Sequence, residues 1–155
     1  MRTLLFITLL SLLGWDGKAQ KPTTMETTTR TSVQTDSAAI AQVLETVYFP
    51  GIYAGDVDHL RTIYHPGTLL FGDVKGQPYA KTLDVYLDGV KNRQSPKDSG
   101  KPFKGEVQKV SVVNSIAVAE VRVKMYDFDY QEFLSFHKID GKWLIVNKMI
   151  SDISK

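Results

Sequence analysis

Apolar side chains between residues 36 and 90 recur at helical spacing. The first stripe consists of Ile40, Val43, Leu44, Val47 and Tyr48. Such a stripe predicts an amphipathic helix that buries one face. Asp36 stands where an N-cap is expected, and Pro50-Gly51 should end or kink the helix because proline cannot donate a backbone hydrogen bond.

Two further helices are expected after this one. Asp56 precedes a short segment that should stop at His65-Pro66, and a short strand is expected over 68–72. Thr82 is placed to cap a third helix. The buried stripe of that helix would be Leu83, Tyr86, Leu87 and Val90. Residues 91–102 are polar and predict a loop.

From Phe103 onward the apolar period changes from that of a helix to two, which is typical of strands. The expected strands are 107–113, 116–125, 130–139 and 142–150. Turns are expected at 114–115, 127–128 and 140–141, and Asp140-Gly141 is the strongest because a type I′ turn favours this pair. A run of strands joined by short turns predicts an antiparallel meander.

Turn positions fix the register, and the register decides which face each side chain occupies. The predicted inner face contains Glu106, Gln108, Val110, Val112, Ala117, Ala119, Val121, Val123, Met125, Leu134, Phe136, Trp143, Ile145, Asn147 and Met149. The predicted outer face contains Glu120, Arg122, Lys124, His137 and Lys148. One apolar face with helices on it indicates an α+β fold.

The first residues read as a targeting signal. A positive start, an apolar run over 4–13 and small residues before Gln20 predict a signal peptide over 1–19 and a secreted or periplasmic protein. N-terminal sequencing of the exported protein should then begin near Gln20. Residues 20–35 are Thr-rich and predict a flexible leader, and 36–155 would form the domain.

Composition narrows the partners. The formal net charge is +2, which gives no electrostatic reason to expect nucleic acid or, once the leader is removed, a membrane surface. There is no cysteine, so disulfides, thiolate metal sites and a cysteine nucleophile are excluded. The three histidines match no zinc spacing, and we expect neither a metal nor a cofactor.

Three stretches resemble a known superfamily. They are 48–56 (YFPGIYAGD), 63–66 (IYHP) and 134–148 (LSFHKIDGKWLIVNK). Together with the element order they resemble the nuclear-transport-factor-2-like (SnoaL-like, cystatin-like) superfamily, and most closely its bacterial "putative lumazine-binding" family. The resemblance covers 37–152. It implies a cone-shaped curved antiparallel sheet with three N-terminal helices on its concave face, a cavity between the layers, and often a dimer.

Within such a cone we expect a small, mostly apolar or aromatic organic ligand. Its lining is predicted to be Tyr48, Tyr53, Tyr86, Val121, Phe136, Trp143, Ile145 and Asn147. A homodimer would form through the convex face of the sheet, using Phe133, Leu144, Val146 and Ile150. The sequence identifies no ligand, pathway or partner protein.

Three hypotheses follow. The first is a binding module without catalysis. The second is an isomerase, dehydratase or cyclase in which Glu106, with a raised pKa, or His65 acts as base and a tyrosine such as Tyr53 donates a hydrogen bond. The third is an interaction module whose cavity is filled by side chains, which a cavity below roughly 300 Å³ would favour.

Overall fold

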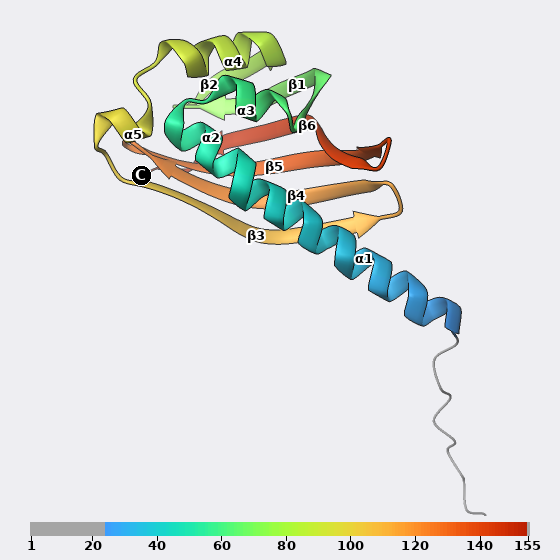
Figure 1. Ribbon diagram of the computed structural model, residues 1–155. Coiled ribbons are helices and arrows are strands. Elements are labelled where there is room, and N and C mark those ends of the chain that lie inside the picture. Colours follow the sequence, from blue (N-terminus) through green and yellow to red (C-terminus); the bar gives the residue numbers. More distant parts are fainter. Residues whose placement is uncertain (1–23, 155) are drawn as a thin grey trace, which may run out of the picture.

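A computed structural model describes residues 24–154, and the predicted signal peptide over 1–19 lies outside them. A curved sheet of six strands carries the helices on one face, and α1 crosses that face diagonally and continues past its edge (Figure 1). This is the α+β arrangement expected from the sequence. Within residues 24–154 no helix is both long and apolar enough to cross a membrane.

The first helical segment is longer than predicted. Helix α1 spans Thr24–Val43, so it begins inside the expected leader, and Asp36 lies within the helix rather than at its cap. A π-turn, η1, follows over Leu44–Tyr48, and α2 spans Phe49–Ala54. The expected break at Pro50 is absent because this residue falls in the first turn of α2, where no backbone donor is needed.

Helices α3 and α4 begin at the predicted caps. Helix α3 is Val57–Arg61, and the Asp56 side chain accepts a hydrogen bond from the backbone N–H of His59 at 2.9 Å. Helix α4 is Leu83–Asn92, capped by Thr82, and its predicted stripe is buried. The expected loop contains one more short helix, α5, over Pro96–Ser99. Local capping chemistry therefore predicts these starts correctly.

The sheet has more strands than the sequence predicts. Their bounds are β1 Tyr64–Val74, β2 Gln77–Thr82, β3 Phe103–Val113, β4 Ile116–Met125, β5 Phe128–Ile139 and β6 Lys142–Asp152. The order across the sheet is β2-β1-β6-β5-β4-β3, and β1 pairs with β6 in parallel. The β1–β2 hairpin turns at Lys75-Gly76, where both residues have positive φ. The meander is antiparallel as predicted, whereas the whole sheet is not.

The inner faces of β4 and β5 are as predicted although their turn is not. Met125 pairs with Phe128, so the turn residues are Tyr126 and Asp127 rather than 127–128. The pairing moves by two residues, and a shift of two preserves the face. Val121 and Phe136 are accordingly buried against the helices, as expected.

A bulge in β6 overturns part of the predicted register. Phe136 pairs with Ile145 but Ser135 pairs with Asn147, which leaves Val146 as the extra residue. One extra residue inverts the faces of everything after it. Lys148 therefore points into the core, where only 2% of it is exposed, and Asn147 leaves the inner face.

The same inversion exchanges Ile150 and Met149. Ile150, expected at a dimer interface, is buried, while Met149 is 51% exposed on the outer face. On the far side of the sheet, a second bulge leaves Gln108 of β3 unpaired. Glu106 and Gln108 are consequently exposed on the outer face and not on the inner one.

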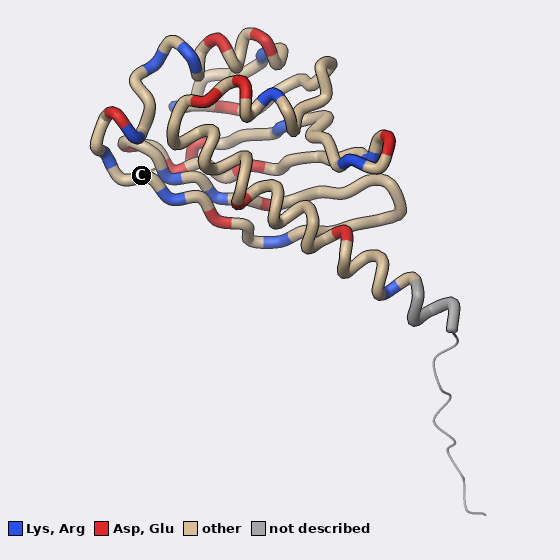
Figure 2. Tube along the Cα trace, viewed as in Figure 1, with Lys and Arg blue, Asp and Glu red and all other residues tan. Residues whose placement is uncertain are grey.

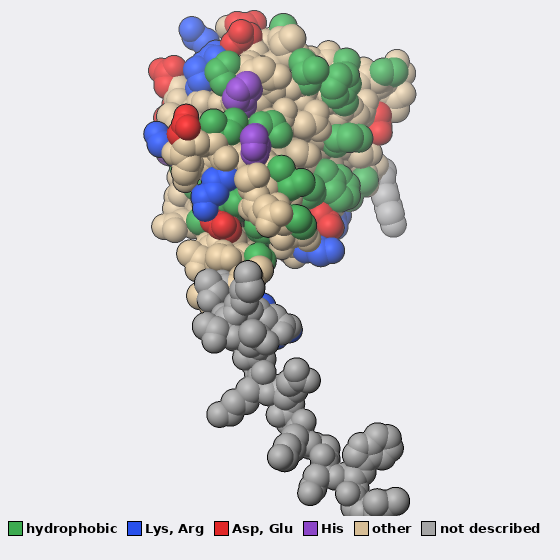
Figure 3. All heavy atoms as spheres, turned by 90° about the vertical axis from the view of Figure 1, so that its right-hand side faces the viewer, with side chains coloured by type: hydrophobic (Ala, Val, Ile, Leu, Met, Phe, Trp, Pro, Cys, Tyr) green, Lys and Arg blue, Asp and Glu red, His purple; other side chains and the backbone are tan. Residues whose placement is uncertain are grey.

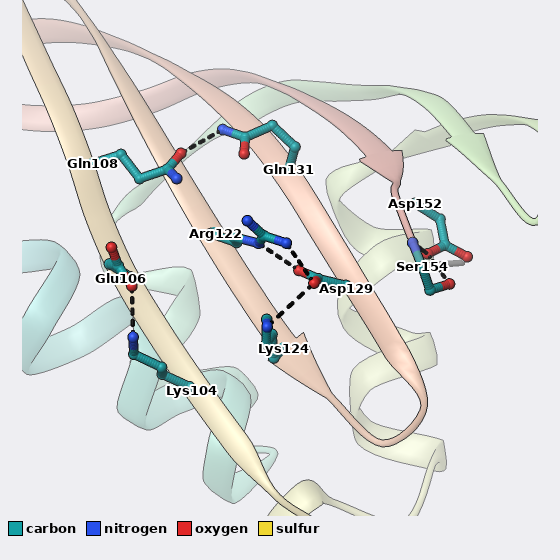
Figure 4. Close-up of polar contacts among 9 residues, drawn as sticks. All are labelled: Lys104, Glu106, Gln108, Arg122, Lys124, Asp129, Gln131, Asp152 and Ser154. Carbon is teal, nitrogen blue, oxygen red and sulfur yellow. Dashed lines mark hydrogen bonds and ion pairs between the residues drawn. The ribbon is translucent and has the colours of Figure 1, made fainter.

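Charged residues gather along β3, β4 and β5 (Figure 2). On the outer face, Arg122 donates two hydrogen bonds of 2.7 Å to the carboxylate of Asp129, and Lys124 lies 3.5 Å from the same carboxylate (Figure 4). Val118, Phe133 and Met149 are 41%, 44% and 51% exposed on the same face. Apolar side chains also reach the surface among charged ones on the side of the molecule shown in Figure 3. The outer face is therefore mixed, with ion pairs beside exposed hydrophobic residues.

Candidate functional site

A small cavity lies between the helices and the sheet. Its volume is about 160 Å³. The wall consists of Ile52, Val74, Tyr79, Lys81, Tyr86, Gly89, Val90, Arg93, Val123, Met125, Tyr130, Glu132, Lys148 and Ile150. Helices α2 and α4 and every strand except β3 contribute to it. The unpredicted strand β2 supplies Tyr79 and Lys81 to one side.

Three polar side chains meet at the inner wall. The Lys148 ammonium donates to Oε1 of Glu132 at 2.6 Å and to the hydroxyl of Tyr48 at 2.7 Å. The Tyr48 hydroxyl donates to Oε2 of Glu132 at 2.6 Å. None of the three is more than 2% exposed. Opposite charges can be buried when short hydrogen bonds join them to each other and to a polar neighbour, as they do here.

The surroundings of this cluster shift its protonation equilibria. Burial raises the pKa of Tyr48, and the charge of Glu132 raises it further, so the phenol stays protonated and serves as a donor. Burial alone would lower the pKa of Lys148, but the charge and hydrogen bond of Glu132 outweigh it, and the pKa is raised. Lys148 is therefore an ammonium at rest.

Aromatic rings surround the ammonium. Nζ of Lys148 lies 5.4 Å from the ring centroid of Tyr48 and 5.1 Å from that of Tyr86, within the range of cation–π attraction. Tyr64 packs against both rings. Burial also raises the pKa of Tyr79 and of Tyr130, so these cavity phenols are uncharged at neutral pH. The polar cluster at the inner wall therefore joins one amine and one carboxyl group among several phenol rings.

Arg93 supplies a second cation, directly after α4. Within residues 24–154, its Nε and Nη2 atoms are buried and have no hydrogen-bond partner. The same two nitrogens of Arg122 hold the carboxylate of Asp129 at 2.7 Å each. Buried donors without partners are costly, so this edge of Arg93 is suited to an anionic oxygen pair from a ligand.

The predicted lining residues separate into groups. Tyr86 lines the cavity, and Tyr48 belongs to its polar cluster. Val121, Phe136 and Ile145 are buried in the core away from the cavity. The remaining three lie elsewhere, and they are Tyr53, Trp143 and Asn147.

Each of these three has a contact of its own. The ring of Tyr53, 40% exposed, packs against Phe103 with centroids 5.3 Å apart. The Trp143 indole donates to Asp36 at 3.1 Å. The Asn147 amide donates to the carbonyl of Leu69 at 2.9 Å. Their side chains thus serve packing and hydrogen bonding within the protein.

The predicted bases lie at the surface. Glu106 bonds to Lys104 at 2.7 Å, and this hydrogen bond lowers its pKa instead of raising it (Figure 4). His65 is exposed, and its Nδ1 accepts from the backbone N–H of Gly67 at 3.1 Å. The enzyme hypothesis therefore fails with these residues. Glu132 is instead a buried carboxylate bonded to a tyrosine, which is the kind of pair that an acid–base enzyme needs.

Sequence reasoning missed Glu132, Arg93 and Lys148. Glu132 shares the parity of Leu134 and Phe136 on β5, and extending that alternation by one step would have placed it inside. Lys148 was assigned to the outer face because no sequence signal marks the bulge at Val146. Arg93 stood in a polar loop. Among residues 24–154, no group of three His, Asp or Glu side chains is arranged to hold a metal.

Solved structures share this fold. A nuclear-transport-factor-2-like protein from Shewanella baltica aligns with a TM-score of 0.67 and 22% identity over 76% of this chain and 94% of that one. A protein of the same description from Silicibacter pomeroyi gives 0.66 and 22% over 74% and 93%. A ketosteroid isomerase-like protein from Erwinia carotovora atroseptica gives 0.59 and 15% over 77% and 98%.

A curated relative is similar in sequence. It is the aldolase FrzH from a Cladobotryum species, 28% identical over 104 residues, which are 66% of this chain and 80% of the relative. The model of the family described as "putative lumazine-binding" matches residues 35–151. The chain thus has the fold of the nuclear-transport-factor-2-like proteins. It belongs to the family described as "putative lumazine-binding".

Proposed function

We propose that this domain binds a small organic anion in the cavity, with Arg93 as the counter-ion. The observation that carries the proposal is the buried Nε–Nη2 edge of Arg93, which is without a partner among the described residues. A carboxylate fits this edge in the geometry that Asp129 adopts on Arg122. The proposed ligand therefore differs from the apolar one expected from the sequence, because it has a charged end.

The size of the cavity limits the ligand. At about 160 Å³ it is below the range of ordinary ligand pockets, which by volume alone favours a filled interaction module. A cavity of roughly 150 Å³ nevertheless accepts benzene, so a short-chain or single-ring acid fits. The unpartnered guanidinium edge favours binding, because a filled structural core would leave two buried donors unsatisfied.

The test is titration calorimetry with short carboxylic acids such as propionate, lactate, pyruvate and benzoate. Arg93→Met should weaken binding by about tenfold to a hundredfold, since charge-assisted hydrogen bonds contribute about 1.5–3 kcal/mol. Lys91→Met, which removes a cation from the last turn of α4, should leave affinity unchanged. Equal affinity of the Arg93 variant and the parent protein would overturn the proposal.

An enzyme is the second candidate. It is favoured by the cluster of Tyr48, Glu132 and Lys148, in which a carboxylate and an amine line the cavity and a phenol is hydrogen-bonded to both. Proton transfer by positioned groups of this kind is the ordinary means of acid–base catalysis. The similarity to an aldolase agrees with carbon–carbon chemistry at such a site. Calorimetry detects binding in a binding module and in an enzyme alike. Detection of a covalent intermediate would distinguish the enzyme.

A further inference from the structure

Lys148 has the position of a nucleophilic amine. It lines the cavity and only 2% of its surface is exposed. An ammonium carries three N–H donors, and two of them are used on Glu132 and Tyr48. The third is therefore available to the cavity. A lysine amine attacks a carbonyl carbon and forms an imine once an adjacent base has taken its proton, and the raised pKa of Lys148 makes such a base necessary.

The neighbours of Lys148 can manage the protons that imine formation requires. The ammonium must first lose a proton, and Oε1 of Glu132 lies 2.6 Å away to accept it. In this buried site, burial disfavours the charged pair. The free-energy cost of forming the neutral acid and the neutral amine is therefore smaller than in water. The hydroxyl of Tyr48 donates to Glu132 and accepts from Lys148, so it holds the two groups in position for this proton transfer.

From this geometry we infer that Lys148 forms an imine with the carbonyl of a small oxo acid. Glu132 takes one proton from the ammonium, the amine adds to the carbonyl carbon, and a second proton moves from the nitrogen to the former carbonyl oxygen to give a carbinolamine. Glu132 returns the proton to the departing oxygen, and water leaves as the C–O bond breaks and the C=N bond forms. Overall, ammonium, carboxylate and ketone become a protonated imine, carboxylate and water, so no oxidant or reductant is consumed.

The substrate class follows from the second cation. The inference rests on the proposed anion binding, because the carboxylate of the oxo acid would occupy Arg93 while its carbonyl reaches Lys148. Both residues line the same cavity, and the charge of each acts to lower the pKa of the Tyr79 phenol against the larger effect of burial. A volume of about 160 Å³ suits acids of the size of pyruvate or 2-oxobutyrate.

The test is reductive trapping. The purified protein is incubated with pyruvate and cyanoborohydride, and hydride addition to the imine carbon makes the link permanent. Intact mass and peptide mapping should find a single adduct on Lys148. Lactate, which matches pyruvate in size but has no carbonyl, should give none. Lys148→Arg keeps the cation and should reduce the adduct to the lactate background, while Lys91→Arg should leave it unchanged.

Peptide mapping of the parent protein decides the matter even if the Lys148 variant does not fold. Adducts spread over exposed lysines, or no adduct while calorimetry still detects pyruvate, would overturn the imine and leave anion binding intact. Loss of both the adduct and the binding would overturn the inference and the proposed function together. A single adduct on Lys148 supports both.

Discussion

Nζ of Lys148 lies 2.6 Å from Oε1 of Glu132, and 2% of each side chain is exposed. The two residues come from neighbouring strands, β6 and β5, and they face each other only because the bulge at Val146 turns Lys148 inward. Breaking a buried pair on one side leaves a charge without compensation, whereas replacing both partners removes the problem. This asymmetry gives a stability test of the cluster.

Lys148→Met should destabilise the protein by about 3–5 kcal/mol, because it leaves the Glu132 carboxylate buried and unpaired. The double variant Glu132→Gln, Lys148→Met should recover much of that loss. Urea unfolding followed by circular dichroism measures both free energies of unfolding. If the double variant is as unstable as the two single losses added together, the pair is not coupled as described.

Asp36 should make the stability depend on acid. The hydrogen bond from Lys138, and after it the one from Trp143, lowers the pKa of Asp36 in the folded protein. The stabilisation is therefore present above the unfolded pKa of about 3.9 and is lost as pH falls through the lower folded pKa. In Asp36→Asn, the urea concentration at the unfolding midpoint should fall less steeply below about pH 4 than in the parent protein.

Lys138→Met tests the same contact from the other side. It removes the principal partner of Asp36, at 2.7 Å, and should flatten the acid limb as the asparagine does. An unchanged acid limb in both variants would mean that this contact between α1 and β5 does not contribute to the acid dependence.

Gly72→Ala should be strongly destabilising. Gly72 has φ of 146°, and a Cβ atom there would lie 1.7 Å from the carbonyl oxygen of Ile150. The parallel β1–β6 pair would have to separate, so we expect a loss above about 3 kcal/mol in urea unfolding. Gly89→Ala is the control, since its nearest neighbour is Nζ of Lys81 at 3.9 Å. Within a helix it should stabilise by about 0.5–1 kcal/mol.

A homodimer through the outer face of the sheet stays a prediction, now with altered residues. Phe133 and Met149 are 44% and 51% exposed there, while Ile150 lines the cavity. Phe133→Glu should convert a dimer into a monomer in light scattering, because a charge would face an apolar partner. Val85→Glu, at a residue 54% exposed on α4, should not. A monomeric parent protein would contradict the prediction.

Local patterns predicted much of the helical layer and the inner face of the meander. Asp56 and Thr82 cap helices because side-chain capping depends on a few adjacent residues. Val121 and Phe136 are buried as expected, since an error of two residues in a turn leaves the face unchanged. The hairpin that adds β2 was not predicted, although Lys75-Gly76 is a turn of ordinary type.

The sequence by itself determined the fold class, most of the elements and the family. Only the tertiary structure decided the site, because the site depends on pairings between strands. The bulge at Val146 exchanges Asn147 for Lys148 on the inner face, and alternation along one strand carries no record of an extra residue in its pairing. Arg93 becomes a site residue because α4 and the sheet enclose it, which no local pattern specifies.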